Sequence, residues 1–435
     1  MFKRLKPHRR GFLAGLLGIS AAMQRGWASL FGAAQAGSFG AKKGERLEPL
    51  FTSREDARRI IDTYCGTNSK APLRPEQANL LISRLRPQLW IAAADGEGEV
   101  GATRFGGAPD MREGASWPMR AAMPDLAKSA AGSRLPNPWI VRQLGEAVPY
   151  EFVAQIDLAE AARHPDHAKG LPQTGRLLFF IDDALLMHEP WGNQSACHLV
   201  FDETPTGDLS RLAAPARFDE MEAWWRTPDP EKIARSEKIA RDLEAAGQKE
   251  AAAAMREVAK ASANPDPKNR KPFVYPARAM KLVPLLALPN ESAIEVGMDT
   301  DLKRLVDDDG AGEHYRRLTA NDIGPFTTDP DDMRVSQPWL MREARRNRLM
   351  GPPQPEQGDP RFDAIPNEEK PPYPWNDVQV AAMSRKADEW QMLLQVSMAD
   401  LSRQDLREGT LYFMLRKDDL ARRDFSRAVV TYQQT

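Results

Sequence analysis

Apolar side chains alternate with other residues along two short stretches of the chain, 175–182 and 409–416. Each stretch opens with a glycine, and every second residue that follows is leucine, isoleucine or phenylalanine. A period of two over about seven residues predicts a half-buried β-strand. Two further stretches, 152–158 and 392–398, also alternate, and each places a glutamine, Gln155 or Gln395, opposite its main apolar face. We therefore expect four strands of this kind.

The predicted strands belong to a longer pattern that occurs twice. Residues 104–109 (Arg-Phe-Gly-Gly-Ala-Pro) precede Gln155 and the strand at 175–182. Residues 348–353 (Arg-Leu-Met-Gly-Pro-Pro) precede Gln395 and the strand at 409–416. Three matching elements in the same order and at similar spacing predict an internal duplication.

The predicted fold class is α+β: two pseudo-symmetric β-rich repeats forming a mostly antiparallel sheet core, with an N-terminal helical cap and a helical insertion. The pattern divides the chain into six parts. They are a twin-arginine-type signal peptide at 1–36, an N-terminal helical region at 37–99, a first repeat at 100–205, the helical insertion at 206–270, a connecting strand and helix region at 271–346, and a second repeat at 347–435.

Helices are predicted outside the repeats. Residues 53–66 begin with a capping-box pattern at Ser53, and a second helix is expected from Pro75 until Pro87 breaks or bends it. Residues 230–260 are rich in strong helix formers with few apolar anchors, which favours an exposed helical hairpin turning at Gly247. Residues 281–289 are expected to form a strand with a proline-limited edge, and the proline-rich residues 351–375 a surface loop.

The first 36 residues have the features of an export signal. They hold six basic residues and no acidic one, including the pair Arg9-Arg10, and a weakly apolar run follows at 11–23. The Ala-Gln-Ala sequence at 34–36 suits a signal peptidase. These features predict twin-arginine export to the periplasm or the medium, with no transmembrane anchor in the mature protein. The alternative is a basic tail on a cytoplasmic protein.

Charge and cysteine content narrow the possible partners. The formal net charge is −1, but the chain after residue 36 has 60 − 6 = 54 basic against 61 acidic residues. A mildly acidic body argues against general nucleic-acid binding, which needs basic residues to neutralise phosphates. The only cysteines are Cys65 and Cys197. Their separation leaves open whether they pair or are buried as free thiols.

These stretches together resemble the YwqG-like family. The resemblance is carried by residues 104–109 with the Trp117-Pro118 pair, 152–158, 175–182, 285–289, 349–357 and 393–426, and the run 416–426 is among the most specific. It covers about residues 100–435, interrupted by the insertion. The family is mainly bacterial, and the resemblance implies a mixed α and β fold with internal pseudo-symmetry. Its activity is not established, so the resemblance implies no catalytic residue.

The candidate ligand-binding residues are the polar ones that the two repeats share, namely Arg104 with Arg348 and Gln155 with Gln395. Each lies in an apolar setting at the matching position of its repeat. A structural role is the alternative, because buried polar groups satisfy backbone groups where strands end. If the repeats pack about a local two-fold axis, we expect the four side chains to approach a shared cleft.

Common catalytic and metal-binding signatures are missing from the sequence, which lacks G-x-S-x-G, H-E-x-x-H and C-x-x-C motifs. The histidine pairs His164 with His167 and His188 with His198 have no further ligands nearby in the sequence, so a turn and a hairpin are the favoured interpretations. The acidic run at 307–310 is expected to be a solvated turn. No metal or cofactor is predicted.

Three hypotheses for the function follow. The first is an exported module that binds a small molecule or a protein in a cleft between the repeats. The second is a carboxylate-dependent hydrolase using residues such as Asp157 and Asp182. The third is a partner-binding role for the helical insertion alone. Two carboxylates converging in one concave site would favour the enzyme.

Overall fold

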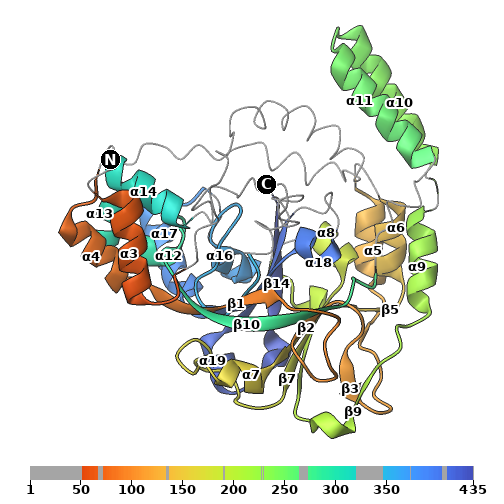
Figure 1. Cartoon of the computed structure of the whole chain (residues 1–435). Helices are drawn as coiled ribbons and strands as arrows, with labels where there is room; N and C mark the ends of the chain where they lie inside the picture. Colours follow the sequence, from red (N-terminus) through yellow and green to blue (C-terminus); the bar gives the residue numbers. More distant parts are fainter. Residues whose placement is uncertain are drawn as a thin grey trace, which may run out of the picture.

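The fold is that of a computed structural model, which describes residues 51–66, 72–133, 137–189, 192–226, 228, 230–263, 273–319, 346–372, 374–403 and 409–434. The predicted signal peptide at 1–36 lies outside these residues. The described chain is a mixed α and β protein built on one large antiparallel sheet, which runs through the centre of Figure 1.

Ten strands form this sheet, in the order β14-β13-β12-β11-β1-β10-β2-β6-β7-β8, and neighbouring strands are antiparallel. Four of them, β6, β7, β12 and β13, are the strands predicted from alternation. The bounds are β1 Arg86–Ala93, β2 Arg104–Phe105, β6 Glu151–Asp157, β7 Arg176–Ile181, β8 Cys197–Asp202, β10 Arg278–Ala287, β11 Arg348–Leu349, β12 Trp390–Ser397, β13 Thr410–Arg416 and β14 Val429–Gln433. Two smaller sheets pair β3 (Asp110–Arg112) with β9 (Leu209–Arg211), and β4 (Met119–Arg120) with β5 (Val148–Pro149).

The two halves of the large sheet have the same order and register. Outward from the central pair β1–β10, the strands run β2-β6-β7-β8 on one side and β11-β12-β13-β14 on the other. Arg104 lies opposite Gln155, and Arg348 lies opposite Gln395. Both glutamine-bearing strands also have a register shift two residues before the glutamine. Residues at the same register in the two halves are called matched positions below.

The sheet is nearly closed into a barrel, because its two edge strands approach each other. Asn193, just before β8, forms an isolated bridge with Val430 of β14, and the Cys197 thiol lies 3.4 Å from the Ala428 carbonyl oxygen. Inside, the rings of Phe179 and Phe413 meet at 5.1 Å between centroids. A single apolar cluster therefore takes side chains from both halves of the sheet.

Helices and short 3-10 turns surround this sheet. Beyond those described in the next paragraphs, they are α5 Pro124–Ala131, α6 Pro138–Gly145, α7 Leu158–Ala162, α8 Asp183–His188, η1 Gln194–Ala196, η2 Thr206–Asp208, η4 Asn367–Glu369, α17 Asp377–Ala387, α18 Met398–Ser402, α19 Lys417–Ala421 and η5 Phe425–Arg427.

The two predicted N-terminal helices are present as α3 (Arg54–Cys65) and α4 (Pro75–Ser83), and the Ser53 hydroxyl caps α3 by accepting from Asp56 N at 3.0 Å. They pack with α13 (Thr300–Val306) and α14 (Asp309–Thr319) around a separate apolar core, on the left of Figure 1. The expectation of an all-helical 37–99 is wrong, because β1 lies within it at the centre of the sheet. Its Leu89 and Ile91 alternate into the central core, a period-two signal that follows Pro87 directly.

The acidic run at 307–310 is an exposed turn at 307–308, as predicted, that leads directly into a helix from 309. The Asp308 carboxylate accepts hydrogen bonds from Gly310 N at 3.0 Å and Ala311 N at 2.8 Å. A side chain that satisfies the first N–H groups of a helix is an N-cap. The run therefore opens α14, whose Tyr315 is fully buried in the core beside α3 and α4.

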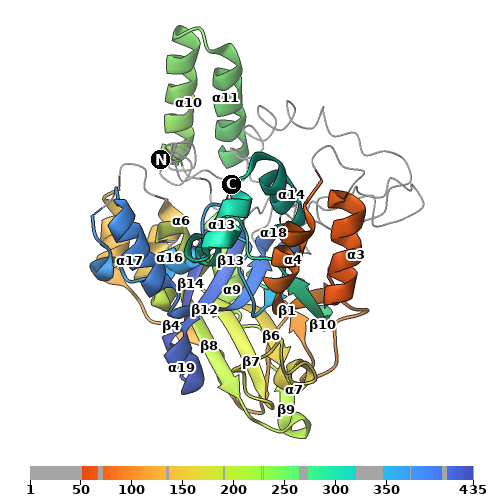
Figure 2. The same ribbon diagram turned by 90° about the vertical axis from the view of Figure 1, so that its left-hand side faces the viewer.

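The insertion contains the predicted helical hairpin, formed by α10 (Pro230–Ala245) and α11 (Lys249–Ala263). Gly247 makes the turn with φ of 78°, and Ala240, Met255 and Val258 form a small core of their own. The hairpin projects from the body in both views (Figures 1 and 2). The rest of 206–270 is not separate from the body, because β9 pairs with β3 and α9 (Arg217–Arg226) buries Phe218 against the first half.

The strand predicted at 281–289 is β10, which is central and not at the sheet edge. Its proline is tolerated for a local reason. The N–H groups of Met280 and Leu286 point away from β1, toward Thr103 O and Phe51 O, so by the period of two the Pro284 nitrogen faces the same way. On that side β2 pairs only with the first two residues of β10.

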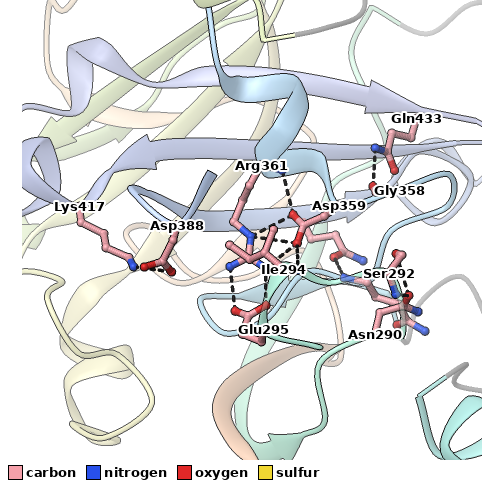
Figure 3. Close-up of polar contacts among 12 residues, drawn as sticks. Asn290, Ser292, Ile294, Glu295, Gly358, Asp359, Arg361, Asp388, Lys417 and Gln433 are labelled. Atoms are coloured by element: carbon pink, nitrogen blue, oxygen red, sulfur yellow. Dashed lines mark hydrogen bonds and ion pairs between the residues drawn. The ribbon is translucent and has the colours of Figure 1, made fainter. Parts of the chain in front are cut away.

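The predicted loop at 351–375 contains a short helix, α16 (Pro360–Ala364), which polar contacts join to α12 (Ile294–Met298). The Arg361 guanidinium donates to Glu295 at 2.8 and 2.5 Å, and Asp359 accepts from the backbone of Ile294 at 3.0 Å (Figure 3). Burial would raise the pKa of Glu295, but the hydrogen bonds and charge of Arg361 hold it below its usual value. These contacts fix the outer helices of the second half against the chain that follows β10.

Candidate functional site

Arg104 lies on β2, between β10 and β6, and its side chain has no exposed surface. Its neighbour Phe105 belongs to the central core, so by alternation Arg104 points to the opposite face of the sheet. There the guanidinium carbon lies 5.7 Å from the ring centroid of Phe152. A charged side chain is thus buried against apolar surface.

Asp110 and Gln155 form a hydrogen-bonded network beside this arginine. Gln155 Nε2 donates to Ala102 O and to Asp110 Oδ2, and its Oε1 accepts from Asp110 N, each at 3.0 Å. The Asp110 carboxylate also accepts from Arg211 Nε at 3.0 Å and from Gly101 N at 2.9 Å. Burial would raise the pKa of Asp110, but these hydrogen bonds and the charge of Arg104 hold it below its ordinary value.

The guanidinium of Arg104 takes no part in that network. Among the described residues none of its three nitrogens has a hydrogen-bond partner, and Nε lies 3.9 Å from Asp110 Oδ2. Burial lowers the pKa of Arg104 to about 10, against the attraction of Asp110. With Arg211 and Glu97 included, two positive and two negative charges act at this position. The site therefore holds a buried guanidinium with unused donors.

The matched residue, Arg348, has a different environment. Its Nη1 donates to Gln88 Oε1 at 3.2 Å, and its Nη2 donates to Gln354. Gln354 N in turn donates to Gln395 Oε1 at 2.9 Å, as Asp110 N does to Gln155. Burial lowers the pKa of Arg348 to about 10. The second half thus uses neutral glutamines around its arginine, where the first half has a carboxylate.

The structure joins the four candidate residues in two pairs, Arg104 with Gln155 and Arg348 with Gln395. Strands β10 and β1 stand between the pairs. Three strand spacings across the sheet and an offset of about four residues along it separate the two arginine backbones by about 19 Å. The two glutamines bind backbone groups near their own strand ends, which is the structural role given as the alternative in the sequence analysis. These four residues therefore do not form the expected shared cleft.

The carboxylates considered for a hydrolase lie at opposite ends of the β6–β7 pair. Asp157 lies opposite Arg176 and caps α7 by accepting from Ala159 N at 3.0 Å. Asp182 directly follows β7 at the other end, where it accepts from Arg120 and from Gln143 at 3.0 Å. Six residues of strand place them about 20 Å apart. They do not converge in one site.

The remaining candidates also have structural surroundings. Cys65 and Cys197 form no disulfide with each other, and both are buried, in different apolar clusters. The rings of His164 and His167 lie edge to face, 6.2 Å apart. Within the part of the chain that the structure describes, no group of three or more His, Cys, Asp and Glu side chains is arranged to hold a metal ion. No helix in that same part is long and apolar enough to cross a membrane.

The comparison with protein families covers every strand of the large sheet except β1. Residues 103–433, from the residue before β2 to the end of β14, match the family described as a domain of unknown function, DUF1963. The chain belongs to this family. No curated protein matches the chain. Membership therefore assigns no activity.

Sequence reasoning did not identify three residues that shape the two arginine sites: Asp110, Arg211 and Gln88. Asp110 stands three residues after Gly107 and shows no pattern of its own. Arg211 comes from the strand β9, more than a hundred residues away. Gln88 lies on β1, which was expected to be part of a helical region. If β1 had been predicted, Gln88 would have been a candidate hydrogen-bond partner for Arg348.

Proposed function

We propose that this protein is a binding module that holds a small anionic ligand at Arg104 in the first half of the sheet. The observation that carries the proposal is the fully buried guanidinium of Arg104, with no hydrogen-bond partner among the described residues. A buried guanidinium whose donors are unused is costly even with a carboxylate oxygen 3.9 Å away, and an anion within hydrogen-bond distance would offset that cost. The positive charge and the donor-only chemistry of the Arg104 guanidinium support an anion over a neutral ligand.

We also propose that the two halves arose by duplication and are related by a local two-fold axis. The pairs of the central β1–β10 ladder, such as Ala92 with Lys281, have residue numbers that sum to 373. Matched positions in these strands differ by 189, since Trp90 and Ala279 lie opposite the matched arginines. Ala92 and Lys281 differ by 189, so they are matched positions, and they also pair with each other in the sheet. Two equivalent residues that face each other are expected where a two-fold axis passes between them, so the pairing supports an axis at this point. Under this proposal the site at Arg104 kept its ligand, while protein side chains filled the matched site at Arg348.

A panel of anions tests the binding function. Wild-type protein is heated in a neutral buffer with formate, acetate, bicarbonate, phosphate or sulfate, and the melting temperature is recorded. At least one anion is expected to raise it, because a ligand that binds only the folded state stabilises that state. Arg104→Met should remove this rise, while its own melting temperature without anions should not fall, since no hydrogen bond is lost.

The matched variant Arg348→Met is the control. It removes an arginine whose hydrogen bonds to Gln88 and Gln354 are made within the protein, so it should lower the melting temperature without anions. The anion-dependent rise should survive in it. If no anion stabilises the wild type, or if Arg104→Met responds as the wild type does, the proposed function is wrong.

We propose export through the twin-arginine route, supported by Arg9-Arg10 and the Ala-Gln-Ala sequence at 34–36. Replacement of both arginines by lysine should leave the full-length precursor inside the cell. The measurement is the size and location of the chain in fractionated cells. A wild-type chain that stays full-length and cytoplasmic would contradict export.

A further inference from the structure

A buried glutamine supplies an acceptor to the arginine of the second half. Gln88 is 2% exposed, and its Oε1 accepts from Arg348 Nη1 at 3.2 Å. Trp90 lies opposite Arg348 in the β1–β11 pair, and Gln88 stands two residues before Trp90 on β1. A planar carboxamide thus reaches the guanidinium from the neighbouring strand.

The matched position in the first half is Ala277, which stands in the same register to Arg104 across the β10–β2 pair. The glycines of the two turns give the same match independently. A Cβ built on Gly107 would lie 2.9 Å from the Cβ of Ala277, and one on Gly351 would lie 2.5 Å from the Cβ of Gln88. The Cβ atoms of Ala277 and Gln88 therefore occupy equivalent positions relative to the two matched arginines. The alanine ends at Cβ and offers no acceptor.

We propose that the carboxylate of a small organic acid takes, beside Arg104, the place that the Gln88 carboxamide occupies beside Arg348. This rests on the proposed function and names its ligand class. A carboxylate is planar, matches a carboxamide in size, and can accept two parallel hydrogen bonds from a guanidinium. A tetrahedral phosphate or sulfate does not match the planar shape of the carboxamide.

The chain between β1 and β2 passes close to the base of the Arg104 side chain, since a Cβ built on Gly98 would lie 3.8 Å from the Cβ of Arg104. This segment is held by Arg211, whose Nη2 donates to Gly98 O at 3.1 Å, and by Gly101 N, which donates to Asp110 at 2.9 Å. Because Arg104 has no exposed surface, a ligand reaches its guanidinium only after the surrounding protein opens locally. Binding is therefore expected to be slow, so samples are incubated with the acid before measurement.

Variants at the matched positions test the ligand class, with acetate and formate as probes and sulfate as the comparison. In the wild type, acetate or formate should raise the melting temperature by several degrees and sulfate should not. Ala277→Gln supplies the missing acceptor from the protein, so it should melt higher than wild type without acid and lose the acid-dependent rise. Ala277→Leu adds bulk without an acceptor, and should lose the rise without melting higher.

The reciprocal variant Gln88→Ala removes the acceptor from Arg348. It should melt lower than wild type and recover part of that loss when acetate is added. An acetate-dependent rise that persists in Ala277→Gln and Ala277→Leu would overturn the ligand class while leaving binding at Arg104 in place. So would stabilisation by sulfate or phosphate but not by acetate or formate. A wild type that responds to no anion would overturn the proposed function itself.

Discussion

The matched glutamines give a prediction in which one residue controls for the other. Gln155→Ala removes three hydrogen bonds, to Ala102 O, Asp110 Oδ2 and Asp110 N. Gln395→Ala removes one, from Gln354 N, because Gln395 Nε2 has no partner among the described residues. Both side chains are fully buried on matched strands, so the cost of losing their bulk is similar and cancels in the comparison.

The expected difference follows from those hydrogen bonds. At about 1 kcal/mol for each buried hydrogen bond, Gln155→Ala should destabilise the protein by about 2 kcal/mol more than Gln395→Ala. The free energy of unfolding is measured by guanidinium chloride denaturation, and the comparison holds only if both variants keep the wild-type dependence on denaturant. Equal losses, or a larger loss for Gln395→Ala, would refute the assignment of these hydrogen bonds.

Three further predictions concern groups away from the arginines. Burial raises the pKa of Asp363 to about 6, so ionising this carboxyl above pH 6 costs the folded state about 2–3 kcal/mol. Asp363→Asn should therefore stabilise the protein by about that amount at pH 8. In denaturation curves the gain should disappear by pH 4, where the wild-type carboxyl is protonated. Replacing residues 229–262 with a short Gly/Ser linker should leave one cooperative unfolding transition, because the hairpin has its own small core, and a broadened transition would contradict this. Burial raises the pKa of Cys197, and Cys65 is also buried, so a thiol reagent should react with both only after unfolding, and rapid reaction of the native protein would argue against their burial.

The alternation of apolar residues located four strands correctly, but β6, β7, β12 and β13 are buried on both faces and are not half-buried as the alternation predicted. The strands of Gln155 and Gln395 were predicted from this alternation, and so was their position opposite the main apolar face. Strand β1 was missed because it begins at Arg86, directly after the helix pattern from Pro75, and Pro87 marked the expected end or bend of that helix. Its pairing with β10, almost two hundred residues away, leaves no local trace.

The candidate site was predictable only in part, for a similar reason. Repetition identified Arg104 and Arg348 as matched residues, but repetition alone treats the two positions as equal. Part of the difference between them lies in the residues at positions 88 and 277, which come from a neighbouring strand in each half. Such contacts depend on which strands pair, and the sequence pattern did not fix the order of the central strands.

The most direct test of the account is to identify what the native protein holds. Wild-type protein and Arg104→Met are purified in buffers free of organic acids and denatured, and the released small molecules are identified by mass spectrometry. The account predicts a carboxylic acid at close to one molecule per chain from the wild type and none from Arg104→Met. Wild-type protein that releases no anion, and that also takes up none when incubated with acetate or formate, would contradict it.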